Sequence, residues 1–109
     1  MNLETALNAN ESDLDHAERR ARQHTLSMAV TNEAELVASF EASRTARGPI
    51  AGLQAYRKVY TLADKVVVVT TTMSGGRFGH WGCIYDVYPT ERLDALVVEA
   101  ESFVNMYVI

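Results

Sequence analysis

The sequence predicts an α+β domain with two N-terminal helices, a three-stranded antiparallel sheet and a C-terminal amphipathic helix. Two observations carry this prediction. Residues 12–30 and 90–105 place apolar side chains at helical spacing, whereas residues 66–72 are seven β-branched residues in succession. The chain has 109 residues, of which 48% are hydrophobic, so residues 1–109 are predicted to form a single globular domain.

The N-terminal region predicts a short helical lead-in over residues 2–10, followed by a longer helix. Ser12 occupies the position of an N-cap and Asp15 follows three residues later, a variant of the capping box. This helix is expected to reach Val30. One continuous apolar stripe should run along it through Leu14, Ala17, Ala21, His24 and Met28.

A second helix is predicted from Asn32, because Glu35 stands three residues later as a capping-box partner. Its apolar face would be formed by Leu36, Val37 and Phe40. Gly48 and Pro49 should end it, since glycine supplies a left-handed C-cap and proline cannot continue a helix.

Residues 50–64 admit two interpretations. Pro49 can open a third helix, which would leave a β-hairpin in place of the three-stranded sheet. Alternatively, residues 56–62 form a strand that turns at Ala63 and Asp64 into the next strand. Their aromatic and β-branched content favours the strand.

The four successive valines of residues 66–69 put apolar groups on both faces, which is typical of a central strand covered on both sides. A return strand is predicted over residues 81–88, with its odd positions forming the more apolar face. Asp86 shares the other face with Ile84 and Tyr88. It therefore needs either an arginine or lysine partner across the sheet, namely Arg57 or Lys58, or a solvated position.

The last helix is predicted to be capped by Thr90, with Glu91 in its first turn, where a negative charge suits the helix dipole. Apolar residues then recur at helical spacing up to Val104. The apolar tail of residues 106–109 should pack on the body of the protein, add to a sheet edge or meet a partner.

No catalytic constellation is evident, and we expect no enzymatic activity, no cofactor and no metal site. Cys83 is interpreted as a small core residue, and His24 as a core or interface histidine. His80 and Cys83 are three apart in a strand, so they should point to opposite faces, which argues against a metal pair or a catalytic dyad.

The glycine-rich segment of residues 74–80 is the best candidate for a contact site. Glycines allow sharp bends and close backbone approach, Arg77 adds charge and Phe78 adds a stacking face. A plain hairpin connection is the alternative. The predicted partner-binding residues are Gly75, Gly76, Arg77, Phe78, His80, Trp81, Arg57 and Lys58.

Charge is unevenly distributed along the chain, whose formal total is −4. Residues 44–80 contain one acidic residue, Asp64. Their basic residues offer a patch for nucleic acid if they gather on one surface, and otherwise simply alternate on the folded surface. They are Arg44, Arg47, Arg57, Lys58, Lys65 and Arg77.

These observations favour a non-enzymatic binding protein, an inhibitor or adaptor, that acts through protein–protein contacts as a homodimer or in a hetero-complex. In its size and acidic balance it resembles the small inhibitors that phages and mobile elements encode against host defences, anti-CRISPR proteins among them. A cytoplasmic location without membrane insertion is expected, because the first residues lack a basic and apolar leader and no apolar run approaches the ~20 residues of a membrane span.

The alternative is a winged-helix DNA-binding transcriptional regulator. The stretch of residues 62–66 is similar to the helix-to-wing junction of that family, and residues 75–79 would be the wing tip. This resemblance requires residues 50–63 to be helical. It implies that Arg57 and Lys58 lie on a recognition helix and that Arg77 reaches a phosphate or the minor groove.

Overall fold

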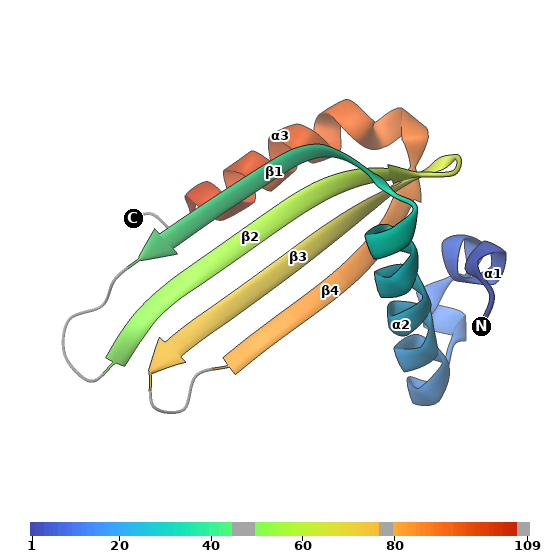
Figure 1. Ribbon diagram of the computed structural model, residues 1–109, viewed down its shortest axis with the longest axis horizontal. Helices are drawn as coiled ribbons and strands as arrows, with labels where there is room; N and C mark the ends of the chain where they lie inside the picture. Colours follow the sequence, from blue (N-terminus) through green and yellow to red (C-terminus); the bar gives the residue numbers. More distant parts are fainter. Residues whose placement is uncertain (45–49, 77–79, 107–109) are drawn as a thin grey trace.

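The computed structural model describes the backbone of residues 1–44, 50–76 and 80–106, and the side chains of residues 1–42, 54–72 and 82–106. Two helices precede four strands, and a third helix follows them (Figure 1). The elements are α1 (Leu3–Asn8), α2 (His16–Asn32), β1 (Glu35–Arg44), β2 (Ile50–Leu62), β3 (Lys65–Gly76), β4 (His80–Pro89) and α3 (Leu93–Asn105). The α+β class is confirmed, but the antiparallel sheet has four strands in the order β1-β2-β3-β4 rather than three.

The additional strand is β1, in the segment predicted as the second helix. Asn32 ends α2 instead of capping a new helix, and Glu35 begins the strand. Leu36 and Phe40 are spaced as on a helix, but Ala38, Phe40 and Ala42 also alternate with polar residues, which is the period of a strand. Pairing with β2 selects the strand, so the helix prediction is wrong. The predicted stop at Gly48 and Pro49 lies outside the described residues.

The ambiguous segment is the strand β2, and the alternative of a third helix with a β-hairpin is wrong. β2 and β3 form a hairpin with Ala63 and Asp64 as its two turn residues, as predicted. Ala63 has a φ of 54°, the left-handed conformation that such tight hairpin turns require at one or both positions.

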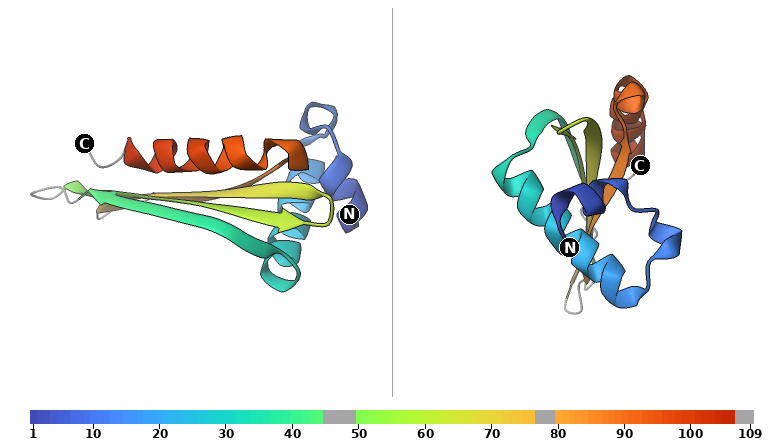
Figure 2. Two further views of the ribbon diagram at one scale, coloured as in Figure 1. Left: turned by 90° about the horizontal axis from the view of Figure 1, so that it is seen from above. Right: turned by 90° about the vertical axis from the view of Figure 1, so that its right-hand side faces the viewer.

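The prediction for the four valines is confirmed, because β3 is an interior strand with a hydrophobic layer on each face. Val66 and Val68 belong to a core with Leu96 of α3. Val67 and Val69 belong to a core with Leu26 of α2 and with residues of α1. Figure 2 shows α3 along one side of the sheet and the N-terminal helices gathered at one end.

Helix α2 begins later than predicted and buries a different stripe. Its N-cap is Asp15, which forms a reciprocal capping box with Glu18, whereas Ser12 lies in a 3₁₀ turn. The buried positions of α2 are Arg22, Leu26 and Ala29, while His24 is exposed and Met28 is 52% exposed. The predicted stripe is therefore wrong, because contacts with α1 and the sheet select a different face of the helix.

Arg22 is buried because it connects the two N-terminal helices. Its Nε donates a hydrogen bond of 2.8 Å to the carbonyl of Ala6, which is fully buried against the same core. A buried guanidinium without such a partner would carry a large desolvation penalty. This contact fixes how α1 lies on α2.

Helix α3 follows a 3₁₀ turn over Thr90–Arg92, and its N-cap position is Arg92 rather than Thr90. The hydroxyl of Thr90 donates to the carbonyl of Asp64 in the β2–β3 turn, so it ties the start of α3 to that hairpin. Leu96, Ala100 and Val104 are buried, as the predicted stripe requires. In the tail, Met106 is 71% exposed, and residues 107–109 lie outside the described chain. Within the described segments, no helix is long and apolar enough for a membrane span.

Candidate functional site

The predicted contact loop falls mostly outside the part of the chain that the structure describes. Arg77 and Phe78 belong to the undescribed residues 77–79. The backbones of Gly75 and Gly76 lie at the end of β3 and those of His80 and Trp81 at the start of β4, but their side chains are not described. The loop therefore stays a prediction.

Arg57 and Lys58, which were predicted to share a binding surface, point to opposite faces of β2. Arg57 lies on the face that α3 covers, where its guanidinium carbon stands 3.7 Å from the centroid of the Phe103 ring. Its Nε also donates to the Thr70 hydroxyl at 3.0 Å. Arg57 is thus part of the packing beneath α3, whereas Lys58 lines a pocket on the other side.

This separation divides the predicted basic patch, in which Arg57 and Lys58 were neighbours. The Arg44 side chain and the whole of Arg47 lie outside the described residues. The recognition helix that the winged-helix alternative requires is replaced by a strand, β2.

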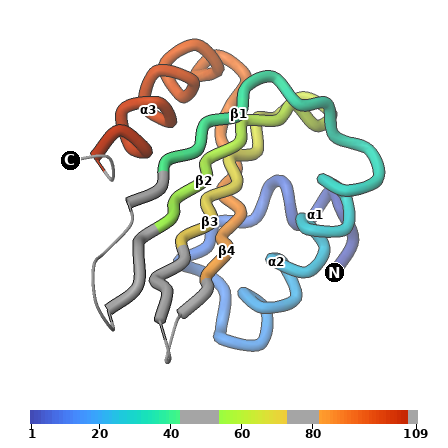
Figure 3. Tube along the Cα trace, turned by 60° about the vertical axis from the view of Figure 1, so that its left-hand side comes forward, coloured from blue at the N-terminus to red at the C-terminus, as the bar shows by residue number. Residues whose placement is uncertain are grey.

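The face of the sheet opposite α3 is covered by α2 near the β2–β3 turn. Beyond that helix no described helix covers it, and Figure 3 shows the four strands side by side. We call this part of the sheet the open face. This open face holds a cavity of about 670 Å³, which we call the tyrosine pocket. Its lining comes from α2, all four strands and the α2–β1 connection: Val30, Thr31, Ala34, Leu36, Tyr56, Lys58, Tyr60, Val69, Thr71, Cys83 and Tyr85.

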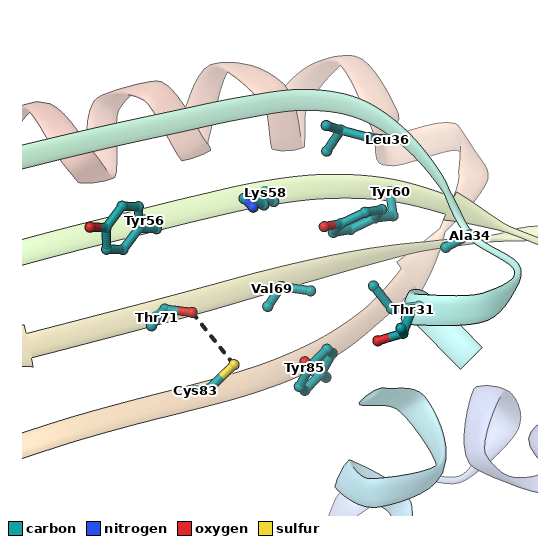
Figure 4. A pocket seen from close by; sticks show the side chains of 11 residues that line it. Thr31, Ala34, Leu36, Tyr56, Lys58, Tyr60, Val69, Thr71, Cys83 and Tyr85 are labelled. Carbon is teal, nitrogen blue, oxygen red and sulfur yellow. Dashed lines mark hydrogen bonds between the residues drawn. The ribbon is translucent and has the colours of Figure 1, made fainter. Parts of the chain in front are cut away.

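Strand register builds the floor of the tyrosine pocket as cross-strand rows. Lys58 of β2 pairs with Val69 of β3, which pairs with Tyr85 of β4. The next row is formed by Tyr56, Thr71 and Cys83. Because side chains alternate along a strand, Tyr56, Lys58 and Tyr60 all rise from the same face of β2 (Figure 4).

The end of the pocket is closed by the last turns of α2, through Val30 and Thr31. Helix α2 is held at the edge of the sheet by Gln23. Its side-chain Nε2 donates to the Tyr85 carbonyl and its Oε1 accepts from the Tyr85 N–H, both at 2.8 Å. This pair of bonds occupies the outward-facing backbone N–H and carbonyl of Tyr85 beside the pocket.

The polar groups of the tyrosine pocket are mostly hydroxyls. The Tyr56 hydroxyl lies 3.2 Å from Gln54 Oε1, and the Thr71 hydroxyl lies 3.5 Å from Cys83 Sγ. Partial burial raises the pKa of the Tyr85 phenol above its ordinary value, with a smaller contribution from the neighbouring Cys83, so Tyr85 stays neutral at physiological pH.

Among the described residues that line the pocket, Lys58 is the one with a charged side chain. Within the described side chains, the ion pair closer than 4.0 Å joins Arg92 to Glu99, so Lys58 has no described carboxylate at that distance. Glu41 lies on the same face of β1 but lines a separate, smaller hollow of about 150 Å³. The pocket is therefore positively charged in a protein whose formal total is negative.

Two residues that were interpreted as core positions are exposed. Cys83 lines the tyrosine pocket instead of lying in the core, because it lies beyond the part of the sheet that α2 covers. His24 is not a core histidine, because α2 packs with the face that carries Arg22, Leu26 and Ala29, and its place at an interface stays a prediction.

Asp86 lies on the α3 side of β4 with Ile84 and Tyr88, as its position predicted, and it is partly buried. Burial raises the pKa of its carboxyl above the ordinary value, and the Glu11 carboxylate raises it further, whereas Arg57 and Arg22 act in the opposite direction. Ile84 is 56% exposed, so this margin of the face is partly solvated.

The described residues contain no group of three or more histidine, cysteine, aspartate or glutamate side chains placed to hold a metal ion. Comparisons with protein-family models, curated proteins and solved structures found no match. The tyrosine pocket must therefore be interpreted from its own geometry.

Proposed function

We propose that this protein is a small non-enzymatic binding protein, an inhibitor or adaptor, and that a protein partner docks on the open face of its sheet. The observation that supports this proposal is the row of Tyr56, Lys58 and Tyr60, which rises from an interior strand on a face that the described helices cover at one end. Tyrosine is enriched among the residues that dominate binding energy at protein interfaces.

The position of these side chains on paired strands favours binding over a structural role. β2 and β3 are interior strands, so the tyrosines are held on a rigid base and lose little freedom when a partner arrives. Leu36, on the margin of the same face, is 51% exposed, and an exposed leucine beside tyrosines is typical of an interface core.

The partner is either another protein or a second copy of this chain. A role for the chain as an inhibitor of host defences is part of the proposal, and small size and acidic balance support it. A cytoplasmic location agrees with an exposed free thiol at Cys83. The winged-helix alternative is not proposed, because β2 occupies the place of its recognition helix.

The test uses two variants, each of which places an arginine on a different face of the sheet. Thr71→Arg fills the middle of the open face, and Ile84→Arg is the matched control, because Ile84 lies on the opposite face of the adjacent strand and is 56% exposed. Partner capture from the source cells and sedimentation of the purified protein are measured for both variants, with circular dichroism to establish folding.

We expect Thr71→Arg to abolish capture, or to convert a dimer to a monomer, while Ile84→Arg keeps wild-type behaviour. If both folded variants retain the partner, or if both lose it, the open face is not the binding surface.

A further inference from the structure

The tyrosine pocket is large enough to hold a small molecule, whether or not a protein partner docks on the open face. Its volume of about 670 Å³ lies within the range of ~300–1,000 Å³ that ligand pockets occupy. Val69 forms the floor, the rings of Tyr60 and Tyr85 stand beside it, and the last turn of α2 closes one end (Figure 4). This arrangement gives the pocket an apolar body with an open side.

The polar part of the pocket carries a positive charge, which comes from Lys58. Lys58 stands between Tyr56 and Tyr60 on β2, directly across from Val69. An ammonium next to an apolar floor is partly desolvated, and an anion that reaches it recovers this penalty through a charge-assisted hydrogen bond. The described lining residues include no aspartate or glutamate to supply that anion.

From this combination we propose that the tyrosine pocket binds a small amphiphilic acid, a molecule with an aliphatic or aromatic body and a carboxylate or equivalent anionic group. The apolar body lies on Val69 between the tyrosine rings, and the anion pairs with Lys58. This inference goes beyond the proposed function, because a small acid can occupy the pocket whether or not a protein docks over it.

The chain carries a reporter for this site. Cys83 is the single cysteine of the sequence, it is exposed, and it lines the pocket. Alkylation by iodoacetamide, an uncharged reagent, therefore measures access to the pocket itself. A ligand that binds elsewhere leaves the rate unchanged, whereas one that fills the pocket slows it.

Three probes that share a ten-carbon chain separate the contributions of charge and apolar body: decanoate, decyl glucoside and decyltrimethylammonium. Decanoate at about ten times its Kd should slow alkylation about tenfold, because only the unliganded fraction reacts. We expect the neutral probe to require a higher concentration and the cationic probe to give no protection. Equal protection by the cationic probe and decanoate, or none by decanoate at any concentration, would overturn the proposal.

Lys58→Met tests the ion pair, since methionine keeps most of the side-chain length without the charge. It should weaken decanoate binding about tenfold, the usual effect of one charge-assisted hydrogen bond, and leave the neutral probe unchanged. Lys65→Met is the matched control, because Lys65 is also a strand lysine and does not line the pocket. Unchanged decanoate affinity in a folded Lys58→Met protein would show that the pocket does not select acids.

A protein partner can fail to appear while decanoate still protects Cys83, and that result rejects the proposed function without affecting this inference. The converse result, in which Thr71→Arg blocks partner capture but decanoate gives no protection in the wild type, rejects only the small ligand.

Discussion

The two faces of the sheet are built from the same strands but are covered in different ways. On the face under α3, Ala38, Ala42 and Ala55 leave room for a helix that lies along β1 and β2. On the other face, α2 crosses only one end, and Tyr56, Lys58 and Tyr60 point away from Arg57 and Val59, which lie under α3. The three alanines thus mark where α3 packs closely on the sheet, whereas the larger side chains of the other face line the tyrosine pocket.

The largest expected effect comes from breaking the covered face. Leu96→Ala removes a side chain that is 4% exposed and packs on Val59, Val66 and Val68, so it should lower the free energy of unfolding by about 3 kcal/mol. Urea denaturation measures this change. Val98→Ala, at a 65% exposed position of the same helix, is the control and should change stability by less than about 0.5 kcal/mol. A loss below about 1 kcal/mol for Leu96→Ala would mean that α3 does not hold this face.

The neighbouring residues Arg57 and Lys58 lie on opposite faces of β2, so substitutions at them compare how much each face contributes to stability. Arg57→Ala loses the contact with Phe103 and the bond to Thr70, and should cost about 1–2 kcal/mol of stability. Lys58→Ala should stay within about 0.5 kcal/mol, because its face is open. Thermal unfolding of both variants decides the point, and equal losses would contradict the assignment of the two faces.

Gln23 determines where the covered part of the second face ends. Gln23→Ala removes both bonds to the Tyr85 backbone and should cost about 1 kcal/mol, with water replacing the lost partners at the edge strand. Alkylation of Cys83 should become faster, since Tyr85 and α2 border the same pocket. If neither the unfolding midpoint nor the alkylation rate changes, α2 is held by its apolar contacts alone.

Asp86 provides the smallest effect, one that depends on pH. Its pKa is raised in the folded state, so the folded protein binds more protons than the unfolded chain between the ordinary value of 3.8 and the raised value. The contribution of Asp86 to the free energy of unfolding is therefore fully present below pH 3.8, and it is lost as the pH rises through the raised pKa.

Asp86→Asn should remove this pH dependence, so the variant gains stability relative to wild type as the pH rises through that window. Denaturant unfolding at several pH values measures the difference. If the stability of Asp86→Asn instead falls relative to that of the wild type as the pH rises, Arg57 and Arg22 outweigh burial at this carboxyl.

The parts of the fold that the sequence predicted are those in which one pattern admits one structure. Four consecutive valines identify an interior strand, and the stripe through Leu96, Ala100 and Val104 identifies a helix packed on it. For β1, Leu36 and Phe40 fit a helix and Ala38, Phe40 and Ala42 fit a strand, so only pairing with β2 distinguishes the two structures.

The tyrosine pocket was only partly predictable. The alternation of Tyr56, Lys58 and Tyr60 in a strand places them on one face, and that signal was present in the sequence. The end of α2 at Asn32 lies close to the predicted Val30. Where α2 lies on the sheet could not be predicted, because it depends on the contact of Arg22 with Ala6 and of Gln23 with Tyr85, which join residues far apart in the chain. That placement leaves Cys83 exposed.

The pair of bonds made by Gln23 also affects how the protein behaves at high concentration. A free strand edge is a template on which another molecule can extend the sheet, and this is a common start of aggregation. At β4, an incoming strand finds the N–H and carbonyl of Tyr85 already taken by a side-chain amide that imitates a peptide unit. One glutamine thus protects this edge strand at Tyr85, as a covering helix or a bulge does in other proteins.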